Sequence, residues 1–308
     1  MDQFFQAIAA NDIAAASALL EKEPTLLRAG AACPGLGGQP QPLAHAARYG
    51  QTQIAQMLLT RGADINAAAD ENRIETPINI AAWFGHGALV EMLLGHSPEL
   101  FVHYTPAHWA YYGSPKPARH QHVIDLLRHY WLARPEIADA HQIQLQTDEF
   151  AISRMTIRSI PAMTVAWISS PQPLAPAEIW GWYSSRYEQH DAALTRSGNA
   201  PIAGAVWRYR FIDERRDSFF LDVAWPVAAG TGLADEKITV GDWPPVRCAS
   251  VFLLGPWKHM GKAWQSLREQ AAAQRVRLGE SGREVYHFPV GPDSTDCITE
   301  IQFQLADE

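Results

Sequence analysis

A repeat in the first half of the chain constrains the fold more than any other feature. The segments QPLAHAARYGQTQIAQMLL and TPINIAAWFGHGALVEMLL nearly superimpose, and TPAHWAYYG matches the start of both. Four successive copies carry an equivalent position, occupied by Asn11, Gly50, Gly85 and Gly113. A short helix, a glycine break and a second helix, repeated about every 30 to 40 residues, predict an α solenoid.

These segments resemble ankyrin repeats. The family's Thr-Pro-Leu-His turn is almost intact as TPIN at 76–79 and TPAH at 105–108. A threonine hydroxyl can cap a helix, and proline in the first turn removes no donor that the helix needs. The resemblance covers residues 1–132, about four helical repeats. It implies either a scaffold that docks a protein partner or a stack that packs against the rest of the chain.

Histidines are frequent in this half, but their spacing does not favour a metal site. His120 and His122 are two residues apart, so on a helix they point away from each other. No cysteine lies nearby to complete a tetrahedral zinc site. His45 and His108 fall at or near the turn histidine of the repeat, where we expect structural hydrogen bonds. We therefore expect no metal and no cofactor.

Composition limits the remaining classes of function. The 308 residues carry a net charge of −8, and 47% are hydrophobic, as in ordinary globular proteins. A negative net charge argues against nucleic acid as a partner. Three scattered cysteines indicate reduced thiols, and we see neither a basic leader nor about 20 continuous apolar residues. We expect a cytoplasmic protein with no nucleic-acid or membrane partner.

The second half has a doubled pattern. After a predicted linker at 133–149, residues 150–308 contain two successive β-α-β-β units. The first comprises ISRMTIRSIPAMTVAWIS, a helix from APAEIWGWYSSRYEQHDAAL, and the strands AGAVWRYRF and SFFLDVAWPV. The second comprises VRCASVFLL, a helix from WKHMGKAWQSLREQAAA, and the strands REVYHFP and CITEIQFQL. The pattern predicts an α+β domain in which two helices cover one antiparallel sheet, with a groove between the halves.

This half resembles the gyrase-inhibitor-like (SOUL/GyrI-like) small-molecule-binding domain. The resemblance rests on IPA at 160–162, LDVAWPV at 221–227, LGPW at 254–257, REVY at 283–286 and the final TEIQFQL. The same fold forms the effector-binding half of several bacterial multidrug-responsive regulators. The resemblance implies a central cavity, whose residues here would be Glu284, Tyr286 and Trp257, with Trp180 or Tyr183 opposite and Trp225 at the floor.

The environment of Glu284 decides between a structural and a functional role. Strand alternation places Glu284 and Tyr286 on one face and Val285 and His287 on the other. A carboxylate among aromatic rings needs a partner, water or a proton. An arginine such as Arg208 or Arg283 could be that partner. The family resemblance favours instead a carboxylate that faces a ligand.

The last strand presents a different carboxylate. Glu300, Gln302 and Gln304 alternate with Ile301 and other apolar residues, so they share one polar face. We expect that face to be solvated and Glu300 to be a surface or structural carboxylate.

Three functions remain open. The first is sensing or sequestration of a hydrophobic, cationic or aromatic small molecule, with the ankyrin repeats as a docking scaffold. The second is a hydrolase of reactive lipophilic compounds, with Glu284 as general acid or base and Tyr286 orienting the substrate. The third is a protein-interaction adaptor whose second half is only structural.

Overall fold

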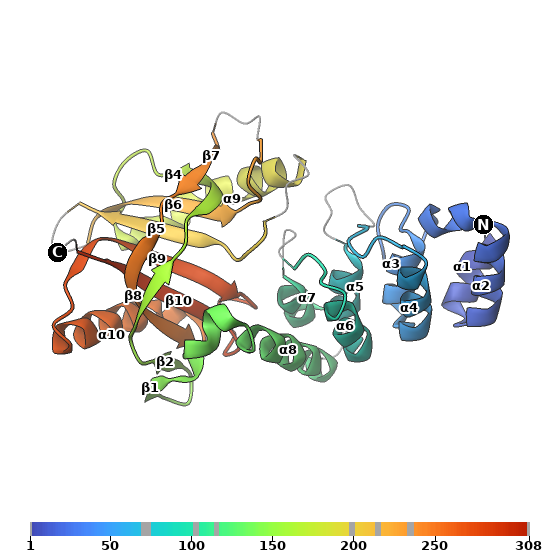
Figure 1. The fold of residues 1–308 in the computed structure, drawn as a ribbon, viewed down its shortest axis with the longest axis horizontal. Coiled ribbons are helices and arrows are strands. Elements are labelled where there is room, and N and C mark those ends of the chain that lie inside the picture. Colours follow the sequence, from blue (N-terminus) through green and yellow to red (C-terminus); the bar gives the residue numbers. More distant parts are fainter. Residues whose placement is uncertain are drawn as a thin grey trace. The chain divides into compact units, whose positions relative to one another are not determined.

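The chain divides into two structural units, residues 1–129 and 130–308. The computed structural model describes residues 2–68, 75–100, 105–113, 117–196, 201–212, 217–232 and 237–306. The first unit is helical, and the second is an α+β unit with a ten-stranded antiparallel sheet (Figure 1). Residues within the predicted linker form the 3₁₀ helix η2 (Pro135–His141) and strand β1 (Ile143–Gln146), and β1 pairs with the sheet.

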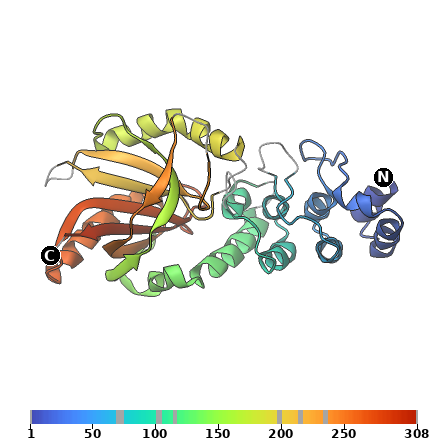
Figure 2. The same ribbon diagram turned by 45° about the horizontal axis from the view of Figure 1, so that its top comes forward.

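The first unit consists of successive helix pairs. They are α1 (Asp2–Ala9) with α2 (Ile13–Lys22), α3 (Pro42–Tyr49) with α4 (Thr52–Thr60), α5 (Pro77–Trp83) with α6 (Gly87–Leu94), and α7 (Pro106–Tyr112) with α8 (Pro117–Leu132). The 3₁₀ helix η1 (Pro24–Arg28) follows α2. First helices contact first helices, as in α3 with α5, and second helices contact second helices, as in α4 with α6. Figure 2 shows the helices of the middle repeats, such as α3 and α4, nearly end-on. Fully buried alanines in α3 and α5 allow this close approach.

The predicted glycine break has a backbone cause. Asn11, Gly50 and Gly85 all adopt the left-handed conformation, with φ of 59°, 69° and 70°, which glycine tolerates best. Gly113 departs from this pattern, with φ of −63°. Glycine is still required there, because a Cβ would lie 2.4 Å from the carbonyl oxygen of Trp83.

Histidines connect neighbouring repeats through the backbone. The Nε2 atom of His86 lies 3.2 Å from the carbonyl oxygen of Arg48, and Nε2 of His120 lies 2.9 Å from that of Trp83. Arg48 and Trp83 occupy equivalent positions, two residues before Gly50 and Gly85. The bonds explain why histidines recur here. Among the described residues, no three His, Cys, Asp or Glu side chains gather in a way that could hold a metal ion.

Because His45 is buried, we expect the stability of the first unit to depend on pH. Burial lowers its pKa below the usual 6.5, although its Nε2 lies 2.9 Å from the carbonyl oxygen of Ala31. The unfolded chain therefore binds this proton more readily, so the stability contribution is complete above pH 6.5 and falls as the pH drops below it. We expect the free energy of unfolding to decrease steadily between pH 6.5 and pH 5. Urea denaturation of the wild type and of His45→Gln across this range measures it, and an identical pH slope in both would contradict the assignment.

The second unit is built on antiparallel strands. They are β2 (Ala151–Ser153), β3 (Thr156–Ile160), β4 (Met163–Ser169), β5 (Val206–Phe211), β6 (Phe219–Pro226), β7 (Thr239–Trp243), β8 (Val246–Leu254), β9 (Leu278–Phe288) and β10 (Ile298–Leu305). Their order is β1-β2-β8-β10-β9-β5-β6-β4-β7, and β3 also pairs with β8. The helices are α9 (Ile179–Arg196), preceded by η3 (Pro176–Glu178), and α10 (Met260–Ala273), preceded by η4 (Trp257–His259).

Two continuous segments of the chain each form two consecutive strands of this sheet. β3 continues into β4 after Pro161-Ala162, and β7 continues into β8 after Pro244-Pro245. Because β3 pairs with β8 and β4 pairs with β7, the segments 156–169 and 239–254 run side by side as one ribbon. Figure 1 shows this ribbon crossing the rest of the sheet. The sheet therefore has an inner face beneath the ribbon, which carries Arg283 and Glu300, and an outer face, which carries Glu284 and Ile301.

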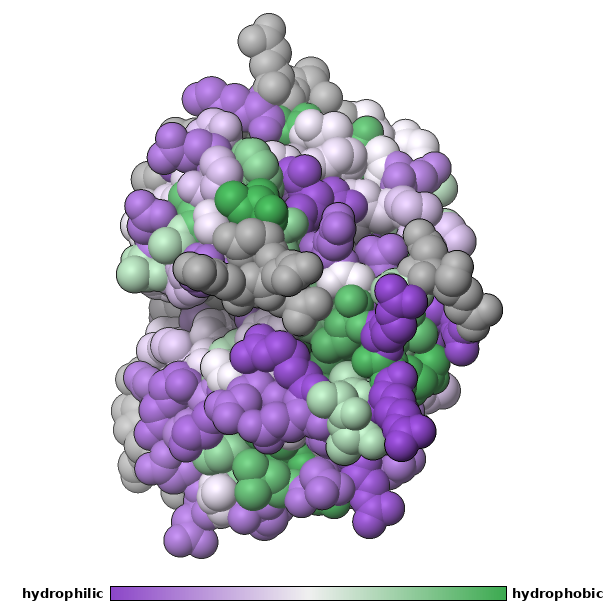
Figure 3. Space-filling model, turned by 90° about the vertical axis from the view of Figure 1, so that its left-hand side faces the viewer, coloured by the Kyte–Doolittle hydropathy of each residue, from purple (hydrophilic) through white to green (hydrophobic). Residues whose placement is uncertain are grey.

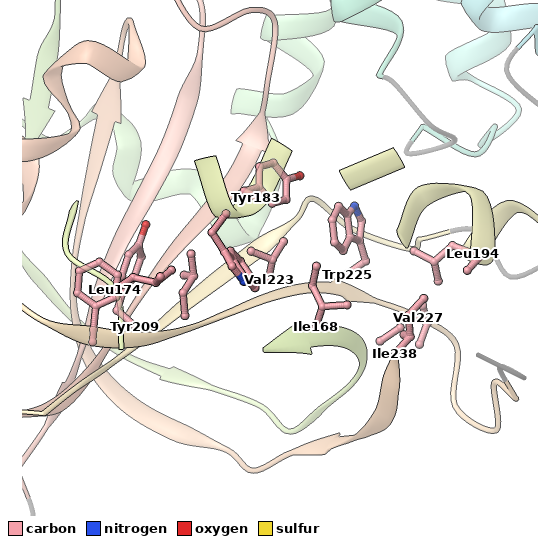
Figure 4. Close-up of a cluster of buried hydrophobic side chains, with 14 residues drawn as sticks. Ile168, Leu174, Tyr183, Leu194, Tyr209, Val223, Trp225, Val227 and Ile238 are labelled. Atoms are coloured by element: carbon pink, nitrogen blue, oxygen red, sulfur yellow. The ribbon is translucent and has the colours of Figure 1, made fainter. Parts of the chain in front are cut away.

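Both helices pack on the outer face. Ala263 and Leu267 of α10 contact a cluster that includes Ile301 and Phe303. Trp182, Tyr183 and Leu194 of α9 belong to a second cluster with Trp225 of β6, where the Trp225 ring lies between Tyr183 and Leu194 (Figure 4). The helices thus flank the junction at which β9 pairs with β5.

The prediction that the polar face of β10 is solvated is wrong. Glu300 and Gln302 are only 2% and 4% exposed, because they lie on the inner face beneath the ribbon. Arg158 of β3 donates to Glu300 at 3.1 Å, Nε2 of His287 lies 2.9 Å away, and the hydroxyl of Ser250 also donates to it. Burial opposes ionisation, but the hydrogen bond and charge of His287, together with Arg158, hold the pKa of Glu300 below its usual value. Glu300 is a buried structural carboxylate.

Candidate ligand-binding site around Glu284

The carboxylate of Glu284 is buried and bonded only by aromatic side chains. Its Oε2 accepts hydrogen bonds from the hydroxyls of Tyr209 at 2.7 Å and Tyr286 at 2.8 Å. Its Oε1 accepts one from the indole Nε1 of Trp264 at 2.7 Å. The residue is 4% exposed. Both oxygens are therefore satisfied as hydrogen-bond acceptors, but no donor cancels their charge.

Three elements assemble this arrangement. Glu284 and Tyr286 lie on β9, Tyr209 lies on the paired strand β5, and Trp264 comes from α10. Gly282 makes room for the helix side chain, since a Cβ there would lie 2.5 Å from the Trp264 ring. The glycine two residues before Glu284 thus lets the indole reach over the strand to the carboxylate.

Electrostatics identify Glu284 as an unneutralised acid. Burial raises the pKa of Glu284, and the bonds from Trp264, Tyr209 and Tyr286 only partly offset this. Burial and the nearby carboxylate raise the pKa of both tyrosines well above 10, so they remain donors. Neither arginine considered as a partner contacts the carboxylate. Arg208 forms an ion pair with Asp222 at 2.7 Å, and Arg283 lies on the inner face. Within the described residues, no basic side chain forms an ion pair with Glu284.

A series of aromatic rings extends over this carboxylate. Ring centres are separated by 6.2 Å between Trp180 and Tyr183, and by 4.7 Å between Tyr183 and Trp207. They are separated by 5.5 Å between Trp207 and Tyr286, and by 5.2 Å between Tyr286 and Trp257. Trp180 is 68% exposed, whereas Tyr183 and Tyr286 are buried. The series therefore runs from the surface of α9 to a ring in direct contact with Glu284.

The remaining sequence-predicted residues occupy different positions. Trp225 lies in the α9 cluster beside Tyr183 (Figure 4). Trp257 is half-buried, and its indole N–H has no hydrogen-bond partner among the described residues. Sequence reasoning missed Tyr209, Trp207 and Trp264. The alternation of aromatic residues in VWRYRF was the available signal for the first two, because it places both rings on the face of Glu284.

A separate pocket lies in the first unit. It has a volume of about 160 Å³ and is lined by Gly35, Leu36, Glu75, Asn79, Ile80, Trp83, Phe84 and Trp109. On the side of the molecule drawn in Figure 3, hydrophobic residues reach the surface in separate patches among hydrophilic ones. None of the described helices has the length and apolar character needed to cross a membrane.

Comparisons with known proteins support the sequence prediction for the first unit. Residues 43–94 match the family model for ankyrin repeats, which confirms the ankyrin resemblance over this range. A search of curated proteins finds none that matches the sequence. Among solved structures, the chain is similar to the EcmrR C-terminal domain, with 17% identity and a TM-score of 0.42, over 50% of this chain and 98% of that one. It is also similar to EcmrR in an EcmrR–DNA complex, with 16% identity and a TM-score of 0.40, over 62% of this chain and 71% of that one.

One of these matches corrects the expectation about nucleic acid. The exclusion rested on the net charge of −8, yet the second solved structure is a complex with DNA. Net charge describes the whole chain, whereas contact with DNA depends on the local distribution of basic residues. The charge argument therefore excludes no such partner.

Proposed function

We propose that residues 130–308 bind a hydrophobic small molecule that carries a positive charge, with Glu284 as its counter-ion. The observation that carries this proposal is the Glu284 carboxylate, which is buried among two phenols and one indole and forms no ion pair with any described residue. A buried charge without a counter-ion is costly to retain. A cationic ligand would supply the missing charge.

The surroundings of the carboxylate suit such a ligand. Hydrogen bonds from Tyr209, Tyr286 and Trp264 favour the ionised acid without neutralising it. The faces of Trp207 and Trp257 can each add a cation–π interaction of about 0.5–2 kcal/mol. Trp180 and Trp257, at the two ends of the ring series, are more accessible than Tyr183 and Tyr286. We infer that the ligand enters at an end of the series and displaces a ring to reach the carboxylate.

Two probes of similar shape and opposite charge test this proposal. We expect tetraphenylphosphonium to quench tryptophan fluorescence saturably, and Glu284→Gln to weaken its affinity about 10- to 100-fold, or about 1.4–2.7 kcal/mol. Tetraphenylborate, which has the opposite charge, should bind Glu284→Gln at least as well as the wild type. Glu280→Gln, which alters an exposed carboxylate on the same strand, is the matched control and should bind like the wild type. Equal phosphonium affinity in the two variants would refute the role of Glu284.

Hydrolysis of a reactive lipophilic compound is the second candidate. Its support is the raised pKa of Glu284, because a general acid or base works best with a pKa near the operating pH. Chromatography of an aryl epoxide incubated with the protein is a direct test, since water added across the C–O bond gives a diol. A diol yield above that of buffer, lost in Glu284→Gln, would support a hydrolase. A yield equal to that of buffer would leave binding as the function.

For the first unit we propose an α solenoid that docks a protein partner. Its pocket is lined by aromatic side chains such as Trp83 and Phe84, a residue type that is enriched at protein interfaces. Replacing Trp83 and Trp109 with alanine should abolish recovery of a specific partner by cross-linking in cells, without changing phosphonium affinity. Undiminished recovery would count against docking at this pocket.

A further inference from the structure

A continuous row of polar residues crosses the inner face of the sheet. Each residue of the row is the register partner of the next one on the neighbouring strand. In order from β3 to β4, the row consists of Thr156, Ser250, Gln302, Arg283, Arg208, Asp222 and Ser169. The ribbon covers this row in part, because Trp243 packs with Val206 and Val285 on the same face. Such a row is unusual beneath a covering strand, since buried polar groups are costly unless each finds a partner.

The acids of the inner face already have basic partners. Asp222 is fully buried and pairs with Arg208 at 2.7 Å and with Arg210 at 3.1 Å. Glu300 pairs with Arg158 at 3.1 Å and lies 2.9 Å from Nε2 of His287. The two carboxylates described on this face, those of Asp222 and Glu300, are thus already paired with other basic residues.

Arg283 is left without an acid. Arg283 is 8% exposed, and in the part of the chain that the structure describes its side chain contacts the Trp243 ring but forms neither an ion pair nor a hydrogen bond. Its register neighbours are Arg208, which repels it, and Gln302, whose Oε1 is buried and unbonded within the same described residues. Burial, followed by the like charge of Arg208, lowers the pKa of Arg283 to about 10. The guanidinium therefore stays charged at neutral pH, and its charge remains unbalanced.

Trp243 provides an unsatisfied donor beside this guanidinium. The Arg283 guanidinium carbon lies 5.3 Å from the centre of the Trp243 ring, and that of Arg208 lies 3.8 Å from it. The indole Nε1 of Trp243 is buried and has no acceptor among the residues described. Two guanidinium groups therefore lie close to one indole ring whose N–H lacks an acceptor among the described residues, and the chemistry that all three groups share is donation to an anion.

We infer that Arg283, Arg208 and Trp243 form a site for a small oxyanion, such as a carboxylate or phosphate group, on the inner face of the sheet. A planar guanidinium can bind a carboxylate or phosphate through two parallel N–H bonds. Gln302 can contribute as well, because rotation of its amide would present the NH2 group instead of the oxygen. The site is distinct from that of Glu284, since adjacent residues of β9 point to opposite faces.

Isothermal titration calorimetry with inorganic phosphate and with acetate, at constant ionic strength, tests the site in the full chain. We expect saturable binding of at least one of the two anions by the wild type. Arg283→Met should weaken it at least tenfold, whereas Arg210→Met, which removes a more exposed arginine of the same face, should change it less than threefold. If phosphate alone binds, the site takes phosphate groups, and if acetate alone binds, it takes carboxylates.

Two further measurements make the outcome decisive. Arg283→Met should retain phosphonium binding, which shows that it is folded, and Glu284→Gln should retain anion binding, so the two proposals can fail separately. Arg283→Met should also raise the thermal midpoint in anion-free buffer, because it removes an unbalanced buried charge. If Arg283→Met cannot be obtained folded, Arg283→Lys replaces it and should weaken binding by removing the paired N–H geometry. Absence of saturable heat in the wild type, or equal anion affinity in a folded Arg283 variant, overturns the inference.

Discussion

Replacing Asp222 with asparagine is expected to lower the free energy of unfolding by about 3–5 kcal/mol. Asp222 is fully buried and accepts hydrogen bonds from Arg208 at 2.8 Å, Arg210 at 3.1 Å and Ser169 at 2.7 Å. Asparagine keeps the shape but removes the charge, so Arg208 would lose its counter-ion beside Arg283, which has no acidic partner among the described residues. Urea denaturation followed by tryptophan fluorescence measures this loss.

Two comparisons isolate the effect of burial. Asp242→Asn removes an exposed carboxylate that accepts a hydrogen bond from Thr164 at 2.6 Å, and should cost no more than about 1 kcal/mol. Adding Arg283→Met to Asp222→Asn should restore part of the lost stability, because one of two repelling cations is removed. A similar cost for Asp222→Asn and Asp242→Asn would show that Asp222 does not hold the inner face together.

Gly255→Ala is the second substitution with a large expected cost, about 3 kcal/mol or more. Gly255 has φ of 137°, a region that other residues rarely adopt, and such backbone strain costs about 1–3 kcal/mol. A Cβ would also lie 2.8 Å from Cβ of Phe150 and 3.0 Å from the carbonyl oxygen of Glu149, and overpacking adds about 1–3 kcal/mol. The turn leads directly to Trp257, so phosphonium affinity should fall together with stability.

Gly261→Ala is the matched control for this substitution. Gly261 lies in α10, and no atom approaches within 4 Å of the position that a Cβ would take. Alanine in a helix is favoured over glycine by about 0.5–1 kcal/mol, so this variant should be slightly more stable than the wild type. Equal changes in the free energy of unfolding for the two alanine variants would refute the argument from backbone conformation.

The repeat and the strand alternation predicted much of the local structure. The Thr-Pro turns begin α5 and α7, where the hydroxyls of Thr76 and Thr105 accept the backbone N–H groups of Asn79 and His108 at 3.4 and 3.3 Å. Local sequence specifies such features because each contact lies within one helical turn. The burial of Glu300 was missed because it depends on the ribbon, which brings Arg158 from 142 residues away.

The candidate site was predicted only in part for the same reason. Alternation correctly placed Glu284 and Tyr286 on one face, because that is a property of a single strand. Trp264 comes from a helix and reaches Glu284 only because Gly282 leaves space for its ring. The sequence alone could not exclude an ion pair between Glu284 and Arg208. Only the strand register shows that Arg208 lies beside Asp222, on the face of the sheet opposite to Glu284.

The alternation of charge along β9 has a consequence for how the strand finds its partners during folding. Arg283 and Glu284 are consecutive, and in the native pairing they face opposite sides of the sheet. A slip of one residue would move the guanidinium to the aromatic outer face and the carboxylate to the inner face, which already carries the carboxylates of Asp222 and Glu300. Every single-residue misalignment of this central strand is thus penalised twice.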